Sequence, residues 1–293
     1  MGFMHVENLY KNQTILLFKE CYASEKIHGT SSHVAWNKKS EDDNQNITFF
    51  SGGASFQNFV SLFNKEDLIE KFKLLGHDEI TIYGEAYGGK MQGMSATYGP
   101  NLKFVAFDVK IGESWLNVPN AEDVTLKMGL EFVHYKKIST DIASIDAERD
   151  APSVQSERNG IIGPKHREGV VLRPLYECFD NKMERIISKH KGEQFSETKT
   201  KREITGEALE VLNKAEDIAV EWVTDMRLEH VLDKLSPNLE MKDIPLIMAA
   251  MYEDVIREAK GEIIESKDLR KAIGTKTAKM FKKKLEDSLY SEL

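Results

Sequence analysis

The spacing of apolar residues divides the chain into two parts. Over about 22–111 and again over 161–191, short β-branched runs bounded by glycine or proline predict strands with helices between them. From about 205 onward the apolar residues recur at helical spacing instead. We therefore expect an α+β fold in two domains, a strand-rich domain over 1–200 and a small all-helical domain over 201–293.

Two of the predicted strands carry side chains suited to a binding site. The run 80–89 is β-branched and delivers Glu85 into a glycine-rich turn. The run 103–109 contains Phe107 next to a carboxylate. A helix is predicted over 65–75, between the first strands and this pair.

Two later strands add charge. The run 168–174 begins with Glu168 and is stopped by a proline. The run 186–191 alternates, so Lys189 and Lys191 fall on the same strand face. Two lysines on one face suit two contacts to a polyphosphate.

Three helices are expected in the C-terminal third. The first carries the apolar residues Leu209, Leu212, Ala219, Trp222, Val223 and Met226. The second runs through 247–259 and the third covers about 278–289, while Pro237 and Pro245 separate the first two. We interpret the apolar stripes as core, and the lysines of the third helix as an alternative surface for a nucleic-acid backbone.

The run Ser24-Glu25-Lys26-Ile27-His28-Gly29-Thr30-Ser31 places a lysine beside a glycine turn. A lysine amine attacks phosphorus only when neutral, yet its ordinary pKa of about 10.4 keeps it charged near pH 7. Nearby cations disfavour the charged form, so a lysine nucleophile predicts further lysines from distant sequence. Lys189 and Lys191 meet that expectation. The glycine of the run lets the backbone approach a ligand, and its hydroxyls offer hydrogen bonds.

Five ordered motifs between 25 and 197 resemble those of the covalent nucleotidyltransferases, which include polynucleotide ligases and messenger-RNA capping enzymes. Within that family the chain is most similar to the ATP-dependent RNA ligases of the phage T4 RNA ligase 2 type. His28 stands where most DNA ligases and capping enzymes carry aspartate, and 188–191 followed by Phe195-Ser196-Glu197 resembles the last motif of that type. The resemblance implies antiparallel sheets flanked by helices, followed by a helical domain.

The resemblance also implies a nucleotide site. Lys26 would attack the α-phosphate of ATP, expel pyrophosphate and hold AMP, while Lys189 and Lys191 would neutralise the charge of the transition state. Phe107 would stack on adenine, although a strand aromatic of this kind is equally often plain core. The residues expected at the nucleotide are Glu25, Ile27, Gly29, Thr30, Glu85, Phe107, Glu168, Lys189 and Lys191.

Metal and phosphate contacts follow from the same resemblance. Glu168 would bind Mg²⁺ or Mn²⁺, and Glu85 would meet the ribose or the metal shell. Asp108 would serve either there or to hold its own strand end. Ser31 and Arg173 would contact nucleic acid or phosphate.

The implied reaction transfers AMP to a 5′-phosphate and then joins a 3′-hydroxyl with release of AMP. We expect RNA ends as substrate, duplexed or nicked, in RNA repair. A DNA-joining ligase with the same mechanism is one alternative, and a non-catalytic protein that binds nucleotides or RNA ends is another. A capping guanylyltransferase fits less well, because an OB-fold would follow the last motif and the tail here is helical.

Several positions depart from the T4 type. Ser31 replaces an asparagine, Ser24 replaces an arginine, and the strand 47–53 lacks an arginine near its end. Arg173 stands where that type has lysine. These positions bind phosphate and the nucleic-acid end in that type, so the substrate preference stays open.

Composition restricts the remaining possibilities. The 293 residues, 41% hydrophobic, suffice for two cores, and no apolar run reaches membrane-spanning length. We expect a monomeric cytoplasmic protein, for example in a phage-infected cell. Two cysteines and dispersed histidines argue against a disulfide framework or a zinc site. The run 84–91 nearly fits a P-loop, but Met91 stands where a hydroxyl is needed.

The net charge of −8 is unusual for an enzyme that acts on nucleic acid. We therefore expect local basic surface around the last motif, with a solvated hinge as the alternative interpretation. The cluster consists of Lys182, Arg185, Lys189, Lys191, Lys199, Lys201 and Arg202.

Overall fold

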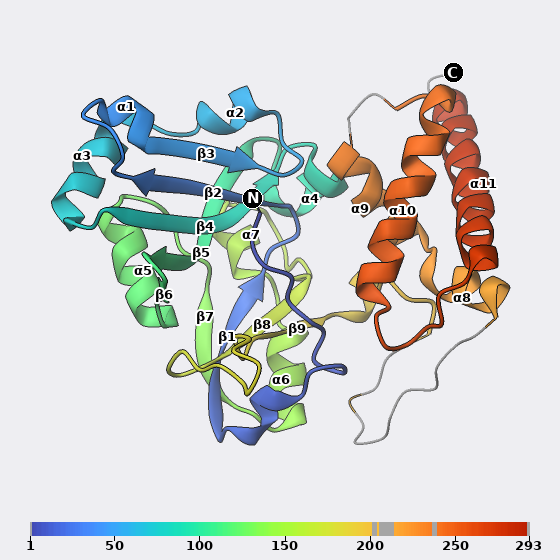
Figure 1. The fold of residues 1–293 in the computed structure, drawn as a ribbon, viewed down its shortest axis with the longest axis horizontal. Coiled ribbons are helices and arrows are strands. Elements are labelled where there is room, and N and C mark those ends of the chain that lie inside the picture. Colours follow the sequence, from blue (N-terminus) through green and yellow to red (C-terminus); the bar gives the residue numbers. More distant parts are fainter. Residues whose placement is uncertain (1, 201–203, 205–213, 236–238, 292–293) are drawn as a thin grey trace. The chain divides into compact units, whose positions relative to one another are not determined.

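The computed structural model describes residues 2–200, 204, 214–235 and 239–291, with side chains of the last helix described to 288. The chain forms two compact units, Met1–Gly192 and Glu193–Leu293 (Figure 1). Two antiparallel sheets with helices make up the first unit, and the second is helical. The α+β fold class predicted from the sequence is confirmed.

A five-stranded sheet has the order β3-β2-β4-β5-β6. Its strands are β2 (Thr30–Asn37), β3 (Ile47–Ser51), β4 (Glu79–Gly88), β5 (Leu102–Ile111) and β6 (Ser114–Trp115). Ile80 and Ile82 of β4 share a core with Phe72 of α3 (Lys65–Leu75) and with Val118 of α5 (Val118–Lys127). Because strand side chains alternate, the helices cover one face of this sheet and Glu85 lies on the other.

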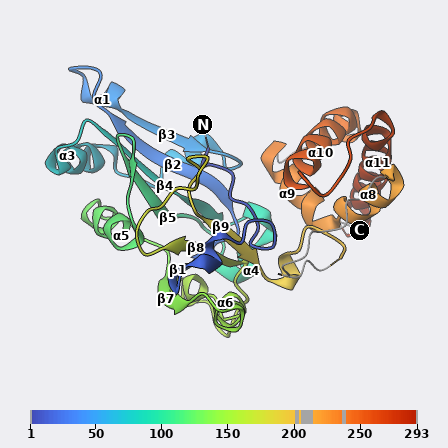
Figure 2. The same ribbon diagram turned by 60° about the horizontal axis from the view of Figure 1, so that its bottom comes forward.

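A four-stranded sheet has the order β7-β1-β8-β9 (Figure 2). Its strands are β1 (Glu20–Lys26), β7 (Tyr135–Ser139), β8 (Gly169–Pro174) and β9 (Ser188–Lys191). The remaining helices of the first unit are η1 (Thr14–Leu17), α1 (Asp43–Asn46), α2 (Phe56–Val60), η2 (Met91–Gly93), α4 (Ser95–Tyr98), α6 (Ile142–Arg149) and α7 (Val154–Arg158).

The register of the four-stranded sheet brings three motifs to one level. Lys26 pairs with Gly169, and Gly169 pairs with Lys191 on its other side. Gly169 has a φ of +154°, and a Cβ there would lie 2.1 Å from the carbonyl oxygen of His190. Only glycine permits this approach of β8 to β9, which aligns the first and last motifs.

The second unit packs helices around its own core. Its elements are η3 (Glu193–Phe195), α8 (Ala215–Trp222), α9 (Asp225–Leu235), η4 (Met241–Asp243), α10 (Ile244–Glu258) and α11 (Lys267–Ser291). Trp222, Leu228, Met251 and Ile273 are buried together in that core. In the part of the chain that the structure describes, no helix has the length and apolar character needed to cross a membrane.

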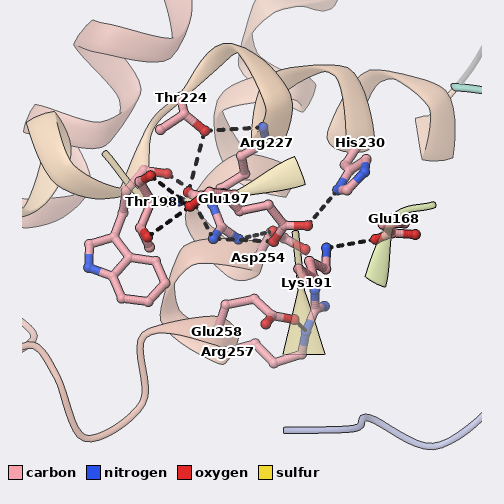
Figure 3. Close-up of polar contacts among 12 residues, drawn as sticks. Glu168, Lys191, Glu197, Thr198, Thr224, Arg227, His230, Asp254, Arg257 and Glu258 are labelled. Atoms are coloured by element: carbon pink, nitrogen blue, oxygen red, sulfur yellow. Dashed lines mark hydrogen bonds and ion pairs between the residues drawn. The ribbon is translucent and has the colours of Figure 1, made fainter. Parts of the chain in front are cut away.

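A buried arginine organises polar contacts in this helical unit (Figure 3). Arg227 of α9 is 1% exposed, and its Nη1 lies 2.6 Å from Oδ2 of Asp254 on α10. Its Nη2 lies 3.4 Å from Oε2 of Glu197, and Oε1 of the same carboxylate lies 2.7 Å from Nδ1 of His230. Glu197 of the Phe195-Ser196-Glu197 motif therefore holds the first residues of the unit to α9.

Most predicted elements of the first unit are confirmed, including the helix over 65–75 and the strands around Glu85, Phe107 and Arg173. The prediction of one helix through Trp222 and Met226 was wrong, because α8 ends at Trp222 and α9 begins at Asp225. The third helix begins at Lys267, well before 278.

Proline placement in the helical unit also differs from the prediction. Pro245 lies in the first turn of α10 and does not precede that helix. The first turn tolerates proline because its N–H would have no partner within the helix. Leu209, Leu212 and Pro237 lie outside the described residues.

Candidate active site

Glu168 connects the first and last motifs. Its Oε2 lies 2.9 Å from Nζ of Lys26, and its Oε1 lies 3.0 Å from Nζ of Lys191. Nδ1 of His28 lies 3.1 Å from the same Oε2. The Glu168 side chain is 2% exposed, whereas that of Lys26 is 23% exposed. The candidate nucleophile therefore keeps access to a ligand while its partner is buried.

The charge of Glu168 is fixed by its neighbours. Burial alone would raise the pKa of this carboxyl, but Lys26, Lys191 and His28 together hold the pKa of Glu168 well below its usual range. A carboxylate whose ionised form is favoured is thus placed between two lysines. His28 was noted in the sequence only for its resemblance to one ligase type, and its contact with Glu168 was not predicted.

Glu85 reaches the same place from the other sheet. Its strand β4 pairs with β2, with Glu85 opposite Ser31. A Cβ on Gly29 would lie 2.3 Å from the carbonyl oxygen of Ala86, so the turn after Lys26 comes this close to β4 only because it has glycine. Burial raises the pKa of Glu85 to about 8, although Lys26 and a hydrogen bond from the Gly29 backbone act in the opposite direction.

Phe107 occupies a β-bulge between β4 and β5. Tyr83 pairs with Asp108 and Gly84 pairs with Ala106, which leaves Phe107 as the additional residue. A bulge bends the strand and re-aims a side chain, and such bulges are frequent next to active sites. The Phe107 ring is partly buried. Its predicted stacking on adenine is untested and remains a prediction.

The carboxylate of Glu25 is used within the protein. Its Oε1 accepts a hydrogen bond of 2.5 Å from the hydroxyl of Ser153. Its Oε2 accepts from the backbone N–H groups of Val154 at 3.0 Å and Gln155 at 3.2 Å, at the start of α7. Burial raises the pKa of Glu25 in spite of these donors. The carboxylate therefore ties α7 to the strand of Lys26, and its predicted nucleotide contact finds no support in this placement.

Arg173 lies in a buried cluster of charges. Its Nη1 lies 3.0 Å from Oδ1 of Asp108, and Arg185 Nη1 lies 2.7 Å from Oδ2 of the same residue. Both arginines also pair with Glu177. Arg173 is 3% exposed and Arg185 is 5% exposed. This geometry does not support the predicted phosphate contact of Arg173, and it removes Arg185 from the expected basic surface.

The other predicted residues have varied surroundings. Ile27 is buried in the core, Thr30 is buried opposite Ala86, and the Ser31 hydroxyl accepts a hydrogen bond of 3.2 Å from the backbone of Phe3. Lys189 lies two residues before Lys191 on β9. Lys201 and Arg202 of the expected basic cluster lie outside the described residues.

The chain is similar to RNA ligases in sequence and in fold. A profile of the RNA ligase family matches residues 19–191. No curated protein matches the sequence. Among solved structures, the RNA ligase of Naegleria gruberi with pyrophosphate is similar, with a TM-score of 0.51 and 14% identity over 67% of this chain.

Two further Naegleria gruberi RNA ligase structures give a TM-score of 0.50 at 15% identity, again over 67% of this chain. Both are lysine-substituted variants, one with ATP and Mn and the other with AMP and Mn. In each comparison the chain spans 57% of the Naegleria protein. At this identity the likeness shows the fold, while the profile match extends over more than half of the sequence and nearly all of the first unit. The chain belongs to the RNA ligase family.

Proposed function

We propose that the protein is an ATP-dependent RNA ligase that joins 3′-hydroxyl and 5′-phosphate ends through AMP bound covalently to Lys26. One observation carries the proposal. In a chain of the RNA ligase family, Nζ of Lys26 lies 2.9 Å from a buried carboxylate that also binds Lys191. A nucleophile, an anionic partner and a phosphate-binding cation thus occupy one site.

The first step forms a bond between Nζ of Lys26 and the α-phosphorus of ATP and breaks the bond to pyrophosphate. The amine must lose a proton to solvent before it attacks, and Oε2 of Glu168, which accepts a hydrogen bond of 2.9 Å from Nζ of Lys26, orients that nitrogen. Lys191 and Lys189 would bind phosphate oxygens and offset the charge that develops on them. When Lys191 turns to phosphate, Glu168 loses one of its cationic partners.

A divalent cation, Mg²⁺ or Mn²⁺, fits the carboxylates of this site. Burial disfavours the charged form of Glu85, and a bound cation would restore it, so Glu85 and Glu168 are the residues that would hold the ion. When bound, such an ion withdraws charge from the phosphates. Among the described residues no group of three metal-binding side chains exists, so the remaining ligands would be phosphate oxygens and water.

We further propose RNA ends as the substrate, duplexed or nicked, and a place near the phage T4 RNA ligase 2 type with a role in RNA repair. The family assignment favours RNA over the DNA-joining alternative. Five functional side chains, four on strands of the two sheets and one directly before β8, favour catalysis over a purely binding protein. These are Lys26, Glu85, Glu168, Lys189 and Lys191.

Incubation with α-labelled ATP and Mg²⁺, followed by denaturing electrophoresis, tests the covalent step. We expect label on the wild-type protein and none on Lys26→Ala. Lys137→Ala is a matched control, because Lys137 lies on β7 of the same sheet with its side chain 51% exposed and paired with Glu20. Equal labelling of wild type and Lys26→Ala would exclude Lys26 as the residue that holds AMP.

Nicked duplexes with an RNA or a DNA strand at the break test the substrate. We expect sealing of the RNA nick and slower or absent sealing of the DNA nick. Faster sealing of the DNA nick would instead favour the DNA-joining alternative. A protein that takes label and seals neither nick would contradict ligation at nicks while leaving the covalent step intact.

A further inference from the structure

A segment that no predicted motif includes runs between the two sheets of the first unit (Figures 1 and 2). We call residues 2–9 the strap. At its far end, Leu9 N–H donates to the carbonyl of Lys189 at 2.8 Å, and Lys189 N–H donates to the carbonyl of Glu7 at 2.9 Å. At its near end, Phe3 N–H donates to the Ser31 hydroxyl at 3.2 Å. The strap therefore binds the strand of the phosphate-site lysines and the strand beside Glu85.

Phe3 places its ring in an aromatic cluster on the five-stranded sheet. Its ring centroid lies 4.9 Å from that of Phe107, 5.2 Å from that of Tyr83 and 5.6 Å from that of Trp115. All three contacts are edge-to-face, which is a favourable geometry for aromatic pairs. Phe107, the bulged residue, is thus held by Phe3 on one side and by its own strand on the other.

The next residue of the strap extends this contact. Sδ of Met4 lies 4.0 Å from Nη1 of Arg185, whose guanidinium lies over the Trp115 ring at 4.0 Å from its centroid. Arg185 in turn pairs with Asp108, the residue directly after Phe107. The strap therefore contacts Phe107 directly through the Phe3 ring. Through Met4 it also contacts Arg185, the partner of Asp108.

We infer that Phe3 is a positioning residue of the nucleotide site, which fixes the Phe107 ring for stacking on the adenine of ATP. The inference rests on the proposed function. A purine stacks well only on a ring whose plane is held, and removal of Phe3 opens space into which Phe107 can rotate. Because the strap also pairs with Lys189, it holds the base end and the phosphate end of the site in one arrangement. Phe3 thus acts through Phe107 and not on the reacting phosphate.

The test measures lysyl-AMP formation in single turnovers against ATP concentration. We expect Phe3→Ala to raise the half-saturating ATP concentration by about tenfold and to leave the maximal rate within about twofold, since ground-state binding is lost and the chemistry is not. Phe3→Tyr keeps the ring and should restore the wild-type value. Phe3→Leu, which fills most of the space, gives an intermediate value and serves if the alanine variant does not fold.

Phe63→Ala is the matched control, because Phe63 is also partly buried and its ring contacts are with Phe49, Phe59 and Phe104. An unchanged half-saturating concentration in Phe3→Ala, or an equal rise in Phe63→Ala, would overturn the inference. If the wild type takes no label, the proposed function fails as well. If it takes label and the Phe3 variants match it, only the role of Phe3 fails.

Discussion

At the scale of single residues, the charge balance of the site depends on Glu168. Its carboxylate is 2% exposed and lies within 3.0 Å of Nζ of both Lys26 and Lys191. Glu168→Gln removes the carboxylate that both ammonium groups contact. We expect it to lower the free energy of unfolding by about 3 kcal/mol, because breaking a buried pair leaves uncompensated charge. Lysyl-AMP formation should fall by roughly a hundredfold.

Urea unfolding and label transfer from ATP measure these two effects. Glu113→Gln provides the control, since that carboxylate pairs with Lys110 but its side chain is 93% exposed. Exposed pairs contribute little, so the control should stay close to wild type in both assays. A stable, fully active Glu168→Gln protein would contradict the role given to this carboxylate.

The raised pKa of Glu85 predicts how the stability of the protein depends on pH. Burial raises the pKa of Glu85 from 4.5 in the unfolded chain to about 8 in the folded protein. Between these values the folded state binds more protons than the unfolded state, so the contribution of Glu85 to stability falls as pH rises from about 4.5 to 8. Glu85→Gln has no carboxyl to titrate at this position, so it does not lose stability for this reason. We expect the variant to be more stable than wild type by a few kcal/mol at pH 8 and nearly equal at pH 4.5.

The measurement is urea unfolding of both proteins across this range, compared as a difference so that other titrations cancel. Glu79→Gln controls for the loss of a carboxylate. Glu79 is exposed on the same strand, and its carboxylate accepts a hydrogen bond from Asn37. The Glu85→Gln protein should also lose lysyl-AMP formation, because glutamine lacks the carboxylate charge proposed to hold the divalent cation. A constant difference from pH 4.5 to pH 8 would contradict a shifted titration of Glu85 in the folded protein.

At the scale of elements, the sequence is informative where a strand has a clear alternation and its ends carry glycine or proline. That is why β4, β5 and β8 were predicted close to their bounds, and with them Glu85, Phe107 and Glu168. The helix α3 was predicted with the correct ends, because Asn64 caps its start and Gly76 follows its last residue in a left-handed conformation.

Contacts between residues far apart in the sequence could not be predicted from the local pattern. Arg173 and Asp108 are 65 positions apart, and a basic residue in a strand gives no sign that it is buried on a carboxylate. The region 112–160 was not assigned, although its Ser153 and the start of α7 bind Glu25. The bulge at Phe107 depends on pairing between strands, which no single run of residues encodes.

The junction of α9 and α10 gives an element-scale prediction. Arg227 pairs with Asp254 and Glu197. Together with Lys234 and Arg257, Arg227 holds the pKa of Asp254 at about 2 despite the burial of that carboxyl. Arg227→Leu removes the guanidinium that both carboxylates contact. We expect the helical unit to lose about 3–5 kcal/mol of stability, with Arg227→Lys intermediate because it keeps the charge but not the planar fork.

Unfolding followed by tryptophan fluorescence reports on this unit when Trp36 and Trp115 are replaced by phenylalanine in every protein compared, because Trp222 in its core is then the one tryptophan left. The free energy of unfolding of the wild type should also fall by about 2 kcal/mol between pH 4 and pH 2. The depressed pKa of Asp254 adds stability above the pKa of the unfolded chain, and this contribution is lost as the pH falls through the folded value. Arg227→Leu should lose less stability over the same range. Arg270→Leu is the control, because Arg270 is exposed and its guanidinium lies over the ring of Tyr252. Equal stability of wild type and Arg227→Leu would show that the buried pair contributes nothing.

At the scale of the whole molecule, each unit has its own core. One core includes Ile82, Phe72 and Val118, and the other includes Trp222, Met251 and Ile273. The match to the RNA ligase family ends at 191, inside the first unit, and the boundary predicted at 200 lies a few residues beyond Gly192. Units with separate cores are expected to fold separately.

The fragment 1–192 should therefore fold alone and carry out the first chemical step. It contains Lys26, Glu85, Glu168 and Lys191 together with the strap, and it lacks none of the contacts described among them. We expect lysyl-AMP formation within about threefold of the full chain, because the side chains proposed for this step all lie in the fragment. The fragment with Lys26→Ala should take no label. Nick sealing compares the fragment and the full chain for the later steps, and a folded fragment that cannot be labelled would show that the helical unit takes part in adenylylation itself.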